Sequence, residues 1–238
     1  MSRFEDLRFF ATAPHPCSYL EGQEATTLFV DPEIRLTPDD IARLTDSGFR
    51  RSGRYTYRPH CQNCQACISV RVCCAEFQPK RRQRRTRYAN EDLTFTLSKP
   101  TMTERHYGLY VDYINARHRD GDMYPPSIDQ YHSFLVTGGE NAFFLEAYLD
   151  QRLIAVTHFE RITGRGLSAI YTFFDPRPEL HARSLGRMMI LQLIEQALLE
   201  KLDYLYLGYW IRDAQKMAYK TEYRPLEMLV NGRWIRAT

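Results

Sequence analysis

Three closely spaced stretches with the composition of β-strands most constrain the fold of this chain of 238 residues. They are AFFLEAYL at 142–149, RLIAVTHFERI at 152–162 and LSAIYTFFDP at 167–176. Asp150 and Gln151 join the first two stretches, and a Gly-containing loop from Thr163 to Gly166 joins the last two. Such short connections predict three consecutive antiparallel strands. The apolar stretch at 184–201 then predicts a long helix directly after them.

Further helices and strands are predicted on both sides of this strand trio. Thr101 with Glu104, and Ser127 with Gln130, have the spacing of helix N-terminal caps. After the long helix, the sequence predicts a strand at 204–210, a helical segment at 214–220 and a last strand at 226–230. This order resembles the acyltransferase fold called GNAT, in which the strand trio leading into a helix handles the acyl donor.

The cysteines divide the sequence into two parts, since all six lie in its first third. We therefore expect an α/β (α+β) protein with a small cysteine-bearing domain at 1–90 and a GNAT-like domain at 91–238, the latter with a mixed, largely antiparallel sheet. Within the first domain, Thr37 predicts the cap of a short helix that ends at Gly48. The segment RRSGRYTYRPHC at 50–61 alternates like a strand.

Composition excludes several classes of protein. About 44% of the residues are hydrophobic, which suits a packed core. No apolar run approaches the roughly 18–20 residues that a membrane span needs, and the first residues lack the apolar region of a signal peptide. We expect a cytoplasmic protein, in which cysteines are more often ligands, reactive thiols or buried thiols than disulfides.

The segment CQNCQAC places three cysteines three residues apart. Thiolates at this spacing can converge on one ion or cluster, and their softness favours zinc or an iron–sulfur cluster. The predicted ligands are Cys61, Cys64 and Cys67, with Cys17 as the fourth, a place that Cys73 or Cys74 could fill less easily. The alternative is that these cysteines are unligated thiols, and we expect Cys73 and Cys74 to be buried.

The net charge of +3 conceals a local concentration of positive charge in KRRQRRTR at 80–87. Its cations are Lys80, Arg81, Arg82, Arg84, Arg85 and Arg87. A run of this density can neutralise several phosphates, which predicts an RNA-binding segment. The alternative is a solvated charged face of a helix or strand.

The loop before the long helix differs from the coenzyme A loop of ordinary acetyltransferases. Only Arg183 and Gly186 match the Arg/Gln-x-x-Gly-x-Gly/Ala pattern, and the tight glycine turn around a pyrophosphate is missing. This difference argues against coenzyme A as the donor.

Several segments together resemble the arginyl-tRNA–protein transferase family, and its bacterial branch in particular. They are PCSYL at 16–20, GFRRSGRYTYRPHCQNCQAC at 48–67, RRQRRTR at 81–87, YTFFDP at 171–176, SLG at 184–186, LGYWI at 207–211 and KMAYK at 216–220. The resemblance implies transfer of leucine from leucyl-tRNA to the α-amine of proteins beginning with Asp or Glu, which marks them for the N-end rule pathway. Eukaryotic relatives carry CxxC where this chain has Cys17 and Leu20, which weakens the expectation of a cluster.

The chemistry of this reaction agrees with the residues of the chain. An aminoacyl ester is already activated, and an α-amine with a pKa of about 7.7–8 is partly neutral at physiological pH. The enzyme then needs positioning, oxyanion stabilisation and protonation of the departing ribose oxygen, with no cofactor required for transfer.

Motif membership and position suggest three sets of site residues. The catalytic candidates are Asp175 as an amine-orienting or proton-accepting carboxylate, Tyr171, Tyr209 and Tyr219 in the site, and Lys216 and Lys220 at the tRNA terminus or the oxyanion. The substrate-binding candidates are Arg50, Arg51 and Arg58 for the acidic acceptor, with Arg183, Ser184 and Gly186 before the long helix. The tRNA-binding candidates are the six cations at 80–87.

Three other functions fit parts of the sequence. Arginyl-tRNA could replace leucyl-tRNA as the donor, because the residues of the donor pocket cannot be identified from sequence. A coenzyme A-dependent acetyltransferase would use the GNAT-like half but not the basic run. A metal-dependent RNA-binding module would use the cysteines and the basic run but leave the second half without a role.

Overall fold

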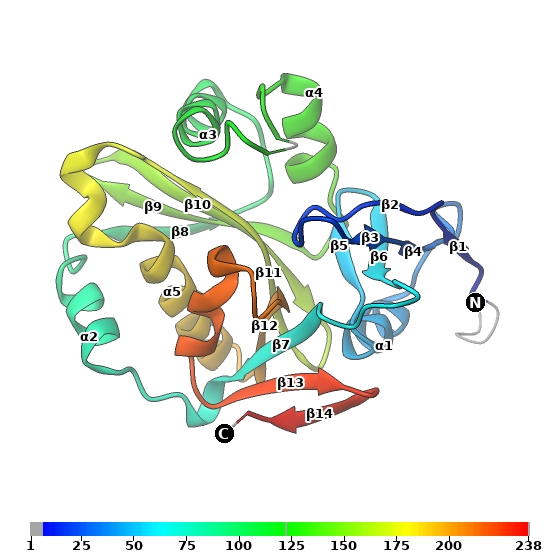
Figure 1. Cartoon of the computed structure of the whole chain (residues 1–238). Helices are drawn as coiled ribbons and strands as arrows, with labels where there is room; N and C mark the ends of the chain where they lie inside the picture. The colour runs from blue at the N-terminus through cyan, green and yellow to red at the C-terminus, as the bar shows by residue number, and fades with distance from the viewer. Residues whose placement is uncertain (1–6, 122, 238) are drawn as a thin grey trace. The chain divides into compact units, whose positions relative to one another are not determined.

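The computed structural model describes residues 7–121 and 123–237 of the chain (Figure 1). They divide into two compact units. Unit 1 comprises the described residues of Met1–Phe77, Ile162–Ser168 and Leu202–Thr238, and unit 2 comprises those of Gln78–Arg161 and Ala169–Lys201. The fold has the predicted mixed α/β class. The units do not follow the boundary predicted at residue 90, because the last strands of the chain group with its first third.

Unit 1 consists mainly of strands. Its helices are α1 (Pro38–Asp46) and the 3₁₀ segments η2 (Cys74–Glu76) and η5 (Gln215–Glu222). Its strands are β1 (Phe9–Ala11), β2 (His15–Pro16), β3 (Glu24–Ala25), β4 (Thr27–Val30), β5 (Arg50–Ser52), β6 (Tyr55–Pro59), β7 (Ile68–Cys73), β12 (Tyr204–Trp210), β13 (Leu226–Val230) and β14 (Arg233–Arg236), with the first residues of β11 (Gly166–Phe174).

The strand order in unit 1 joins distant parts of the sequence. β1, β4, β6 and β5 are neighbours in that order, and β2 pairs with β3. β14, β13, β7 and β12 are also neighbours in that order and pair antiparallel. Gly166 to Ser168 run parallel to Tyr204 to Tyr206. The predicted strands at 204–210 and 226–230 are confirmed, whereas sequence patterns did not indicate β14 or the position of β7 between β12 and β13.

The short helix predicted after Thr37 is confirmed as α1. The Thr37 hydroxyl accepts a hydrogen bond from the Asp40 amide, and the Asp40 carboxylate accepts one from the Thr37 amide, which completes a capping box. The segment at 50–61 differs from the single predicted strand, because it forms the hairpin of β5 and β6. Gly53 has a φ of 54°, so the glycine permits the turn between them.

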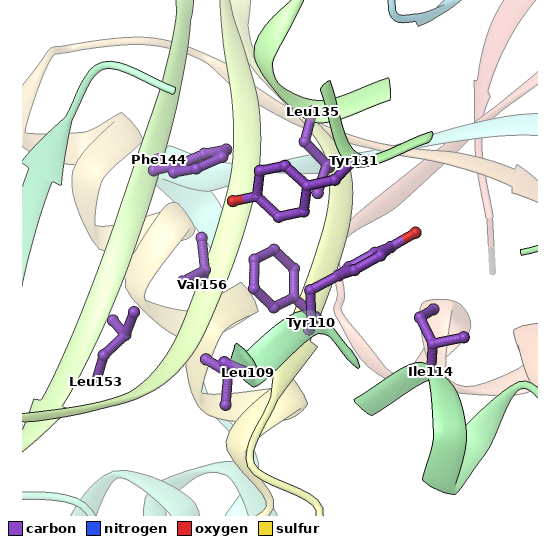
Figure 2. Close-up of a cluster of buried hydrophobic side chains, with 9 residues drawn as sticks. Leu109, Tyr110, Ile114, Tyr131, Leu135, Phe144, Leu153 and Val156 are labelled. Carbon is purple, nitrogen blue, oxygen red and sulfur yellow. The ribbon is translucent and has the colours of Figure 1, made fainter. Parts of the chain in front are cut away.

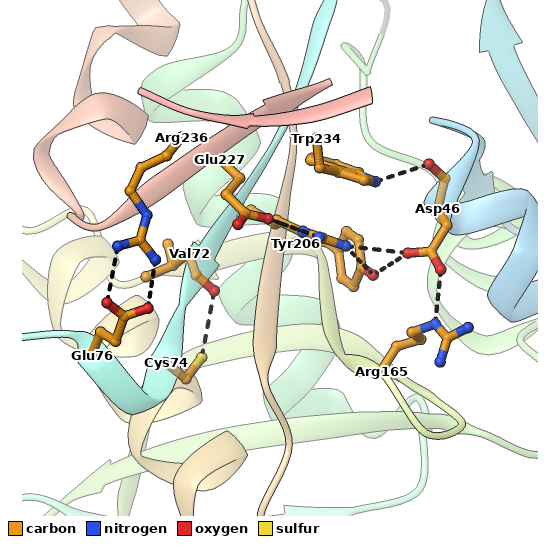
Figure 3. Close-up of polar contacts among 10 residues, drawn as sticks. Asp46, Val72, Cys74, Glu76, Arg165, Tyr206, Glu227, Trp234 and Arg236 are labelled. Atoms are coloured by element: carbon orange, nitrogen blue, oxygen red, sulfur yellow. Dashed lines mark hydrogen bonds and ion pairs between the residues drawn. The ribbon is translucent and has the colours of Figure 1, made fainter. Parts of the chain in front are cut away.

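A polar network around Arg71 holds three elements of unit 1 together, and Figure 3 labels its partners Asp46, Glu227 and Trp234. Arg71 on β7 forms ion pairs with Asp46 at 3.3 Å and with Glu227 on β13 at 2.7 Å. Its guanidinium lies 3.6 Å from the ring centroid of Tyr204 and 4.2 Å from that of Trp234. The Arg71 side chain is only 9% exposed. A buried cation that is paired and stacked in this way ties α1, β7 and the β13–β14 hairpin to one arrangement.

Unit 2 contains the predicted strand trio and most of the helices. Its helices are α2 (Arg81–Tyr88), α3 (Glu104–Arg117), α4 (Ile128–Tyr131), the π-helical turn η3 (His132–Val136), the 3₁₀ segment η4 (Pro178–Arg183) and α5 (Leu185–Leu199). Its strands are β8 (Thr94–Ser98), β9 (Ala142–Leu149), β10 (Arg152–Ile162) and the remainder of β11, in the order β11, β10, β9, β8.

The turns and caps of unit 2 match the predictions at most positions. Asp150 and Gln151 have φ of 48° and 66°, as the tight turn of a β-hairpin requires. Ser127 caps α4 by accepting from the Gln130 amide. The cap predicted at Thr101 is wrong, because Thr103 is the residue that accepts from an amide, that of His106, and α3 begins after it.

The core of unit 2 lies between the sheet and the helices α3 and α4 (Figure 2). α3 and α4 cover one face of β8 to β10, and α5 lies on the other face (Figure 1). Tyr110 from α3 and Tyr131 from α4 meet edge to face, with ring centroids 5.2 Å apart, and both contact Phe173 of β11. This core is aromatic rather than purely aliphatic.

In residues 7–121 and 123–237, no helix has the length and apolarity that crossing a membrane requires.

Candidate functional site

A cavity of about 550 Å³ in unit 1 brings together the four predicted cysteine ligands. Cys17, Cys61, Cys64 and Cys67 all contribute to its lining, and so do residues of β6 and β12. Burial raises the pKa of Cys67 to about 12, and the other three thiols add to the increase. Cys17, Cys61 and Cys64 are therefore each close enough to Cys67 to affect its pKa.

The cysteines fit a metal in chemical type, but they are not arranged around an ion. Four thiols on one cavity are the soft donor set that zinc or an iron–sulfur cluster takes. Across the described ranges, no three His, Cys, Asp or Glu side chains are close enough to hold a metal ion. As predicted, Cys73 and Cys74 are buried.

Tyr209 lines the same cavity from β12. Its hydroxyl donates a 2.8 Å hydrogen bond to the carbonyl oxygen of Gly48, and its ring packs edge to face with Tyr57, with centroids 6.5 Å apart. Burial raises the pKa of both tyrosines, an effect that Arg50 opposes. Tyr209 therefore keeps its proton, and that proton is already used on the Gly48 carbonyl.

Lys220 lies on the backbone side of Tyr209. Its Nζ donates a 2.6 Å hydrogen bond to the carbonyl oxygen of Tyr209, and the residue is 8% exposed. Burial, and next the positive charge of Arg50, lower the pKa of Lys220 to about 7. Lys220 thus combines a buried amine with a nearby cation, an arrangement found more often at functional sites than elsewhere.

The three arginines proposed for the acidic acceptor occupy different environments. In the register of the β5–β6 hairpin, Arg50 lies opposite Tyr57, and Arg51 lies opposite Thr56. Because side chains alternate along a strand, Arg50 and Arg51 point to opposite faces. Arg58 lines the cysteine cavity, stacks 5.0 Å from the centroid of Phe49 and donates to the Ser47 carbonyl at 3.3 Å. The positive charge of Arg50 acts to lower the pKa of both Lys220 and Tyr209.

The other two candidates from the C-terminal motif are exposed. Lys216 and Tyr219 belong to the 3₁₀ segment η5, and 42% of Tyr219 is accessible to solvent. Both residues can meet a partner at the surface, while Lys220 on the same segment is buried.

Asp175 lies in unit 2, directly after β11. Arg152 and Arg177 both donate hydrogen bonds to its carboxylate, and the Arg177 amide donates another at 3.1 Å. Burial raises the pKa of Asp175 above its ordinary value, with Arg152 acting in the opposite direction. The carboxylate borders a cavity of about 560 Å³ that also contacts α3 and the β9–β10 turn. Asp175 is thus a positioned carboxylate at an open site.

Tyr171 lies in the aromatic core on the α3 side of β11. Its ring centroid is 5.3 Å from that of Phe134 and 6.4 Å from that of Tyr113. Its hydroxyl is buried without a hydrogen-bond partner among the described residues, and burial raises its pKa. An unpaired buried hydroxyl is costly and is a donor that a bound ligand could use.

The residues before α5 have structural contacts of their own. The Arg183 guanidinium donates two 2.7 Å hydrogen bonds to the Asp92 carboxylate and a third, at 3.0 Å, to the Ala89 carbonyl. Ser184 has a φ of 52° and makes no side-chain cap. A Cβ at Gly186 would lie 3.2 Å from the Phe174 ring, so the glycine lets α5 approach β11. Arg183 is the least available of the three for a ligand.

The basic run forms the helix α2. Its buried positions are Gln83 and Thr86, and the cations lie on the remaining surface. Lys80, Arg81, Arg82, Arg84 and Arg85 are exposed, while Arg87 is half-buried 3.8 Å from Glu195. Tyr88 ends the helix with 76% of its surface exposed. The helix therefore presents a row of positive charge with an aromatic ring at its end.

Sequence reasoning missed Tyr57, which lies beside Arg50, Cys67 and Tyr209. The Gly53–Arg54 dipeptide was the available signal. Treated as a hairpin turn, it would have placed Tyr57 opposite Arg50.

Known proteins resemble the chain along nearly its whole length. Family models described as Arginine-tRNA-protein transferase, N terminus, and Arginine-tRNA-protein transferase, C terminus, match residues 15–85 and 105–230. The chain is 49% identical to the aspartate/glutamate leucyltransferase of Pseudomonas putida, with 99% of each chain covered. It is 50% identical to that of Marinobacter nauticus, with 98% of each covered. Among solved structures, L-PGS from Bacillus licheniformis aligns with a TM-score of 0.45 at 11% identity, over 76% of this chain and 54% of that one.

Proposed function

The chain belongs to the arginine-tRNA–protein transferase family, and we propose that it transfers leucine from leucyl-tRNA to the α-amine of proteins beginning with Asp or Glu. The observation that carries this proposal is its 49–50% identity to aspartate/glutamate leucyltransferases over nearly all of both chains. The product would enter the N-end rule pathway as a degradation signal. The substrate, an aminoacyl-tRNA, locates the reaction in the cytoplasm.

The reaction exchanges one acyl bond for another. The acceptor α-amine attacks the carbonyl carbon of the leucyl ester, an amide bond forms, and the ester bond to the ribose oxygen breaks. A proton leaves the amine, and the ribose oxygen gains one. The enzyme must therefore orient the amine, stabilise the oxyanion and support the proton transfer.

Asp175 is our candidate for orienting the amine and accepting its proton. Burial raises its pKa, which makes it a better proton acceptor than an ordinary carboxylate, while Arg152 and Arg177 hold its geometry. Among the residues that the structure describes, the Tyr171 hydroxyl has no hydrogen-bond partner, and we propose it as a donor to the oxyanion. The Tyr209 hydroxyl already donates its proton in a hydrogen bond to the Gly48 carbonyl. We therefore propose that Tyr209 positions the substrate and does not donate to the oxyanion.

The α2 helix is our candidate for binding the tRNA. Its exposed cations match the charge of a phosphate backbone, and Tyr88 provides a surface on which an unpaired base could stack. Lys216 and Tyr219 are surface candidates for the aminoacylated terminus. Ser184 and Gly186 stay candidates for donor binding, whereas Arg183 is held by Asp92.

The proposal includes a metal at Cys17, Cys61, Cys64 and Cys67, which share one cavity. A zinc ion or an iron–sulfur cluster bound there would stabilise the loop that carries three of the thiols. Transfer itself requires no redox chemistry, and the steps above do not involve the metal.

A transfer assay with two donors and four acceptors tests this function. Purified protein is incubated with leucyl-tRNA or arginyl-tRNA and with peptides that begin with Asp, Glu, Arg or Lys. We expect leucine on the Asp and Glu peptides only. Transfer of arginine to the Asp and Glu peptides would show that arginyl-tRNA is the donor. Transfer of leucine to the Arg or Lys peptides would show that basic N-termini are the acceptors.

Labelled acetyl-CoA provides the comparison with an ordinary acetyltransferase. Acetyl transfer without aminoacyl transfer would overturn the proposal. Binding of tRNA without transfer of either amino acid would support the non-catalytic RNA-binding module instead.

A further inference from the structure

The cavity beside Asp175 in unit 2 is lined by side chains of both charges. It has a volume of about 560 Å³, and its lining comes from α3, the β9–β10 turn and the end of β11. Its charged residues are three arginines and three aspartates, namely Arg105, Arg152, Arg177, Asp112, Asp150 and Asp175. Their formal charges cancel, so the cavity suits a small ligand that carries both charges better than the polyanionic backbone of RNA.

Helix α3 contributes a cation, an apolar side chain and an anion to this cavity. They are Arg105, Leu109 and Asp112, whose spacing of four and then three residues puts them on one face of the helix. The rise of seven residues separates Arg105 from Asp112 by about 10 Å along the helix axis. Leu153 of β10 adds a second apolar side chain. A ligand in the cavity therefore meets separated charges with apolar surface between them.

Of the three arginines, Arg105 is the one that no carboxylate of the described residues holds. Arg152 and Arg177 both donate hydrogen bonds to the Asp175 carboxylate. Arg105 is exposed, and it makes no hydrogen bond or ion pair with any residue that the structure describes. Burial raises the pKa of Tyr148 to about 12, and the positive charge of the nearby Arg105 acts in the opposite direction. The N–H donors of Arg105 are therefore open to a ligand.

The first residue of the proposed acceptor carries two polar groups close together. Its α-amine and its side-chain carboxylate are separated by Cα and one methylene in Asp, and by one further methylene in Glu. The side chains that bind both groups must therefore line the same cavity. Asp175, our candidate for the amine, shares its cavity with Arg105, whereas Arg58 lines the cysteine cavity of unit 1.

We propose that this cavity holds the first residue of the acceptor, and that Arg105 binds its side-chain carboxylate while Asp175 orients its α-amine. This inference rests on the proposed function, because it assigns the acceptor specificity of that reaction. A planar guanidinium donates two parallel hydrogen bonds to a carboxylate. The long Arg105 side chain reaches the carboxylate of either Asp or Glu. The neutral amides of Asn and Gln form weaker hydrogen bonds with it, so peptides that begin with them are poorer acceptors.

Binding of fluorescent peptides that begin with Asp or with its uncharged isostere Asn tests the subsite directly, without tRNA. The protein is compared as wild type, Arg105→Gln, Arg105→Lys and Arg117→Gln, the last being an exposed cation on the same helix that does not line the cavity. We expect Arg105→Gln to reduce the preference for Asp over Asn about 10-fold. Arg105→Lys should restore part of the preference, and Arg117→Gln should leave it unchanged.

The kinetic form of the test uses the ratio of kcat/KM for the Asp and Asn peptides. Loss of this ratio in Arg105→Gln, with an unchanged KM for leucyl-tRNA, supports the subsite. If Arg105 instead contacts a phosphate of the tRNA, Arg105→Gln will raise the KM for leucyl-tRNA at an unchanged ratio, and the inference is overturned. Loss of the ratio in Arg58→Gln but not in Arg105→Gln also overturns it, because the carboxylate then binds in unit 1. Absence of leucyl transfer by the wild type contradicts the proposed function alone, since peptide binding still reports on the cavity.

Discussion

Lys220 Nζ lies 2.6 Å from the carbonyl oxygen of Tyr209, so the segment after β12 folds back onto the strand that precedes it. The motif LGYWI followed by KMAYK thus forms one local site in which a lysine contacts the backbone of its own motif. Burial of this contact, and next the nearby Arg50 charge, lower the pKa of the amine to about 7. This environment makes the stability of the protein dependent on pH.

We expect the free energy of unfolding of wild type, relative to Lys220→Met, to rise between pH 7 and pH 9. The folded protein holds Lys220 at a pKa of about 7, below the ordinary value of 10.5. Above pH 7 the unfolded state therefore binds more protons, and stability increases with pH by at most ~1.4 kcal/mol per unit. Urea unfolding of both proteins at several pH values measures the difference. A difference independent of pH would show that the lysine keeps its ordinary pKa.

Arg71→Met should lower the free energy of unfolding by about 3 kcal/mol, because it leaves the Asp46 and Glu227 carboxylates without their buried partner. Arg165→Met is the matched control, since Arg165 also pairs with Asp46 but is 47% exposed. Its loss should cost less than ~1 kcal/mol. Chemical denaturation of both variants makes the comparison, and equal losses would contradict the structural role of Arg71.

Asp175→Asn should reduce kcat for leucyl transfer about 100-fold or more, because an amide cannot accept the proton. Binding of leucyl-tRNA should be unaffected. Arg233→Gln is the control, since Arg233 is an exposed cation on β14 with no assigned role in transfer, and its kcat should be unchanged. Circular dichroism verifies folding. Full activity of a folded Asp175→Asn would exclude the catalytic assignment.

Replacing Arg81, Arg84 and Arg85 on α2 by Gln should weaken tRNA binding more at low salt than at high salt. Each lost phosphate contact reduces the slope of log K against log salt by about 0.7–0.9, so three contacts should reduce it by about 2–3. Filter binding over a salt series measures the slope. An equal slope for the variant and for the Arg233→Gln control would place the tRNA elsewhere.

Protein purified without oxygen should contain zinc, or iron with sulfide, if the four cysteines of the cavity bind metal. Cys67→Ser should lose the metal, because Cys67 is the thiol coupled to the other three. Cys74→Ala should retain it, since that buried thiol contacts the Val72 carbonyl instead. Elemental analysis and the visible absorption spectrum distinguish the two metals. Metal-free protein with full activity would remove the metal from the proposal.

Local signals in the sequence predicted individual elements well. The capping residues Thr37 and Ser127 and the Asp150–Gln151 turn act within a few positions of the chain, so their effect can be derived from neighbouring residues. The cap at Thr101 failed because two threonines two residues apart compete. The structure selects Thr103, and the Thr101 carbonyl accepts a hydrogen bond from Tyr131 instead.

The sequence identified individual residues of the candidate site but did not show which of them lie together. Arg50, Cys67, Tyr209 and Lys220 were each named from motifs, yet only the fold shows that Arg50 and Lys220 converge beside Gly208. Tyr57 was missed because its importance depends on the hairpin that places it opposite Arg50. Such relations join residues up to 170 positions apart, as with Arg50 and Lys220, and no local pattern contains them.

The sequence by itself determined the family, the class of reaction and most of the helices and strands, since these depend on motifs and on short-range periodicity. Only the tertiary structure decided that β7 lies between β12 and β13, and that the first third and the last strands of the chain form one unit. The reason is that strand pairing forms between segments distant in sequence, and the free energy of such contacts is set by packing and hydrogen bonding in three dimensions.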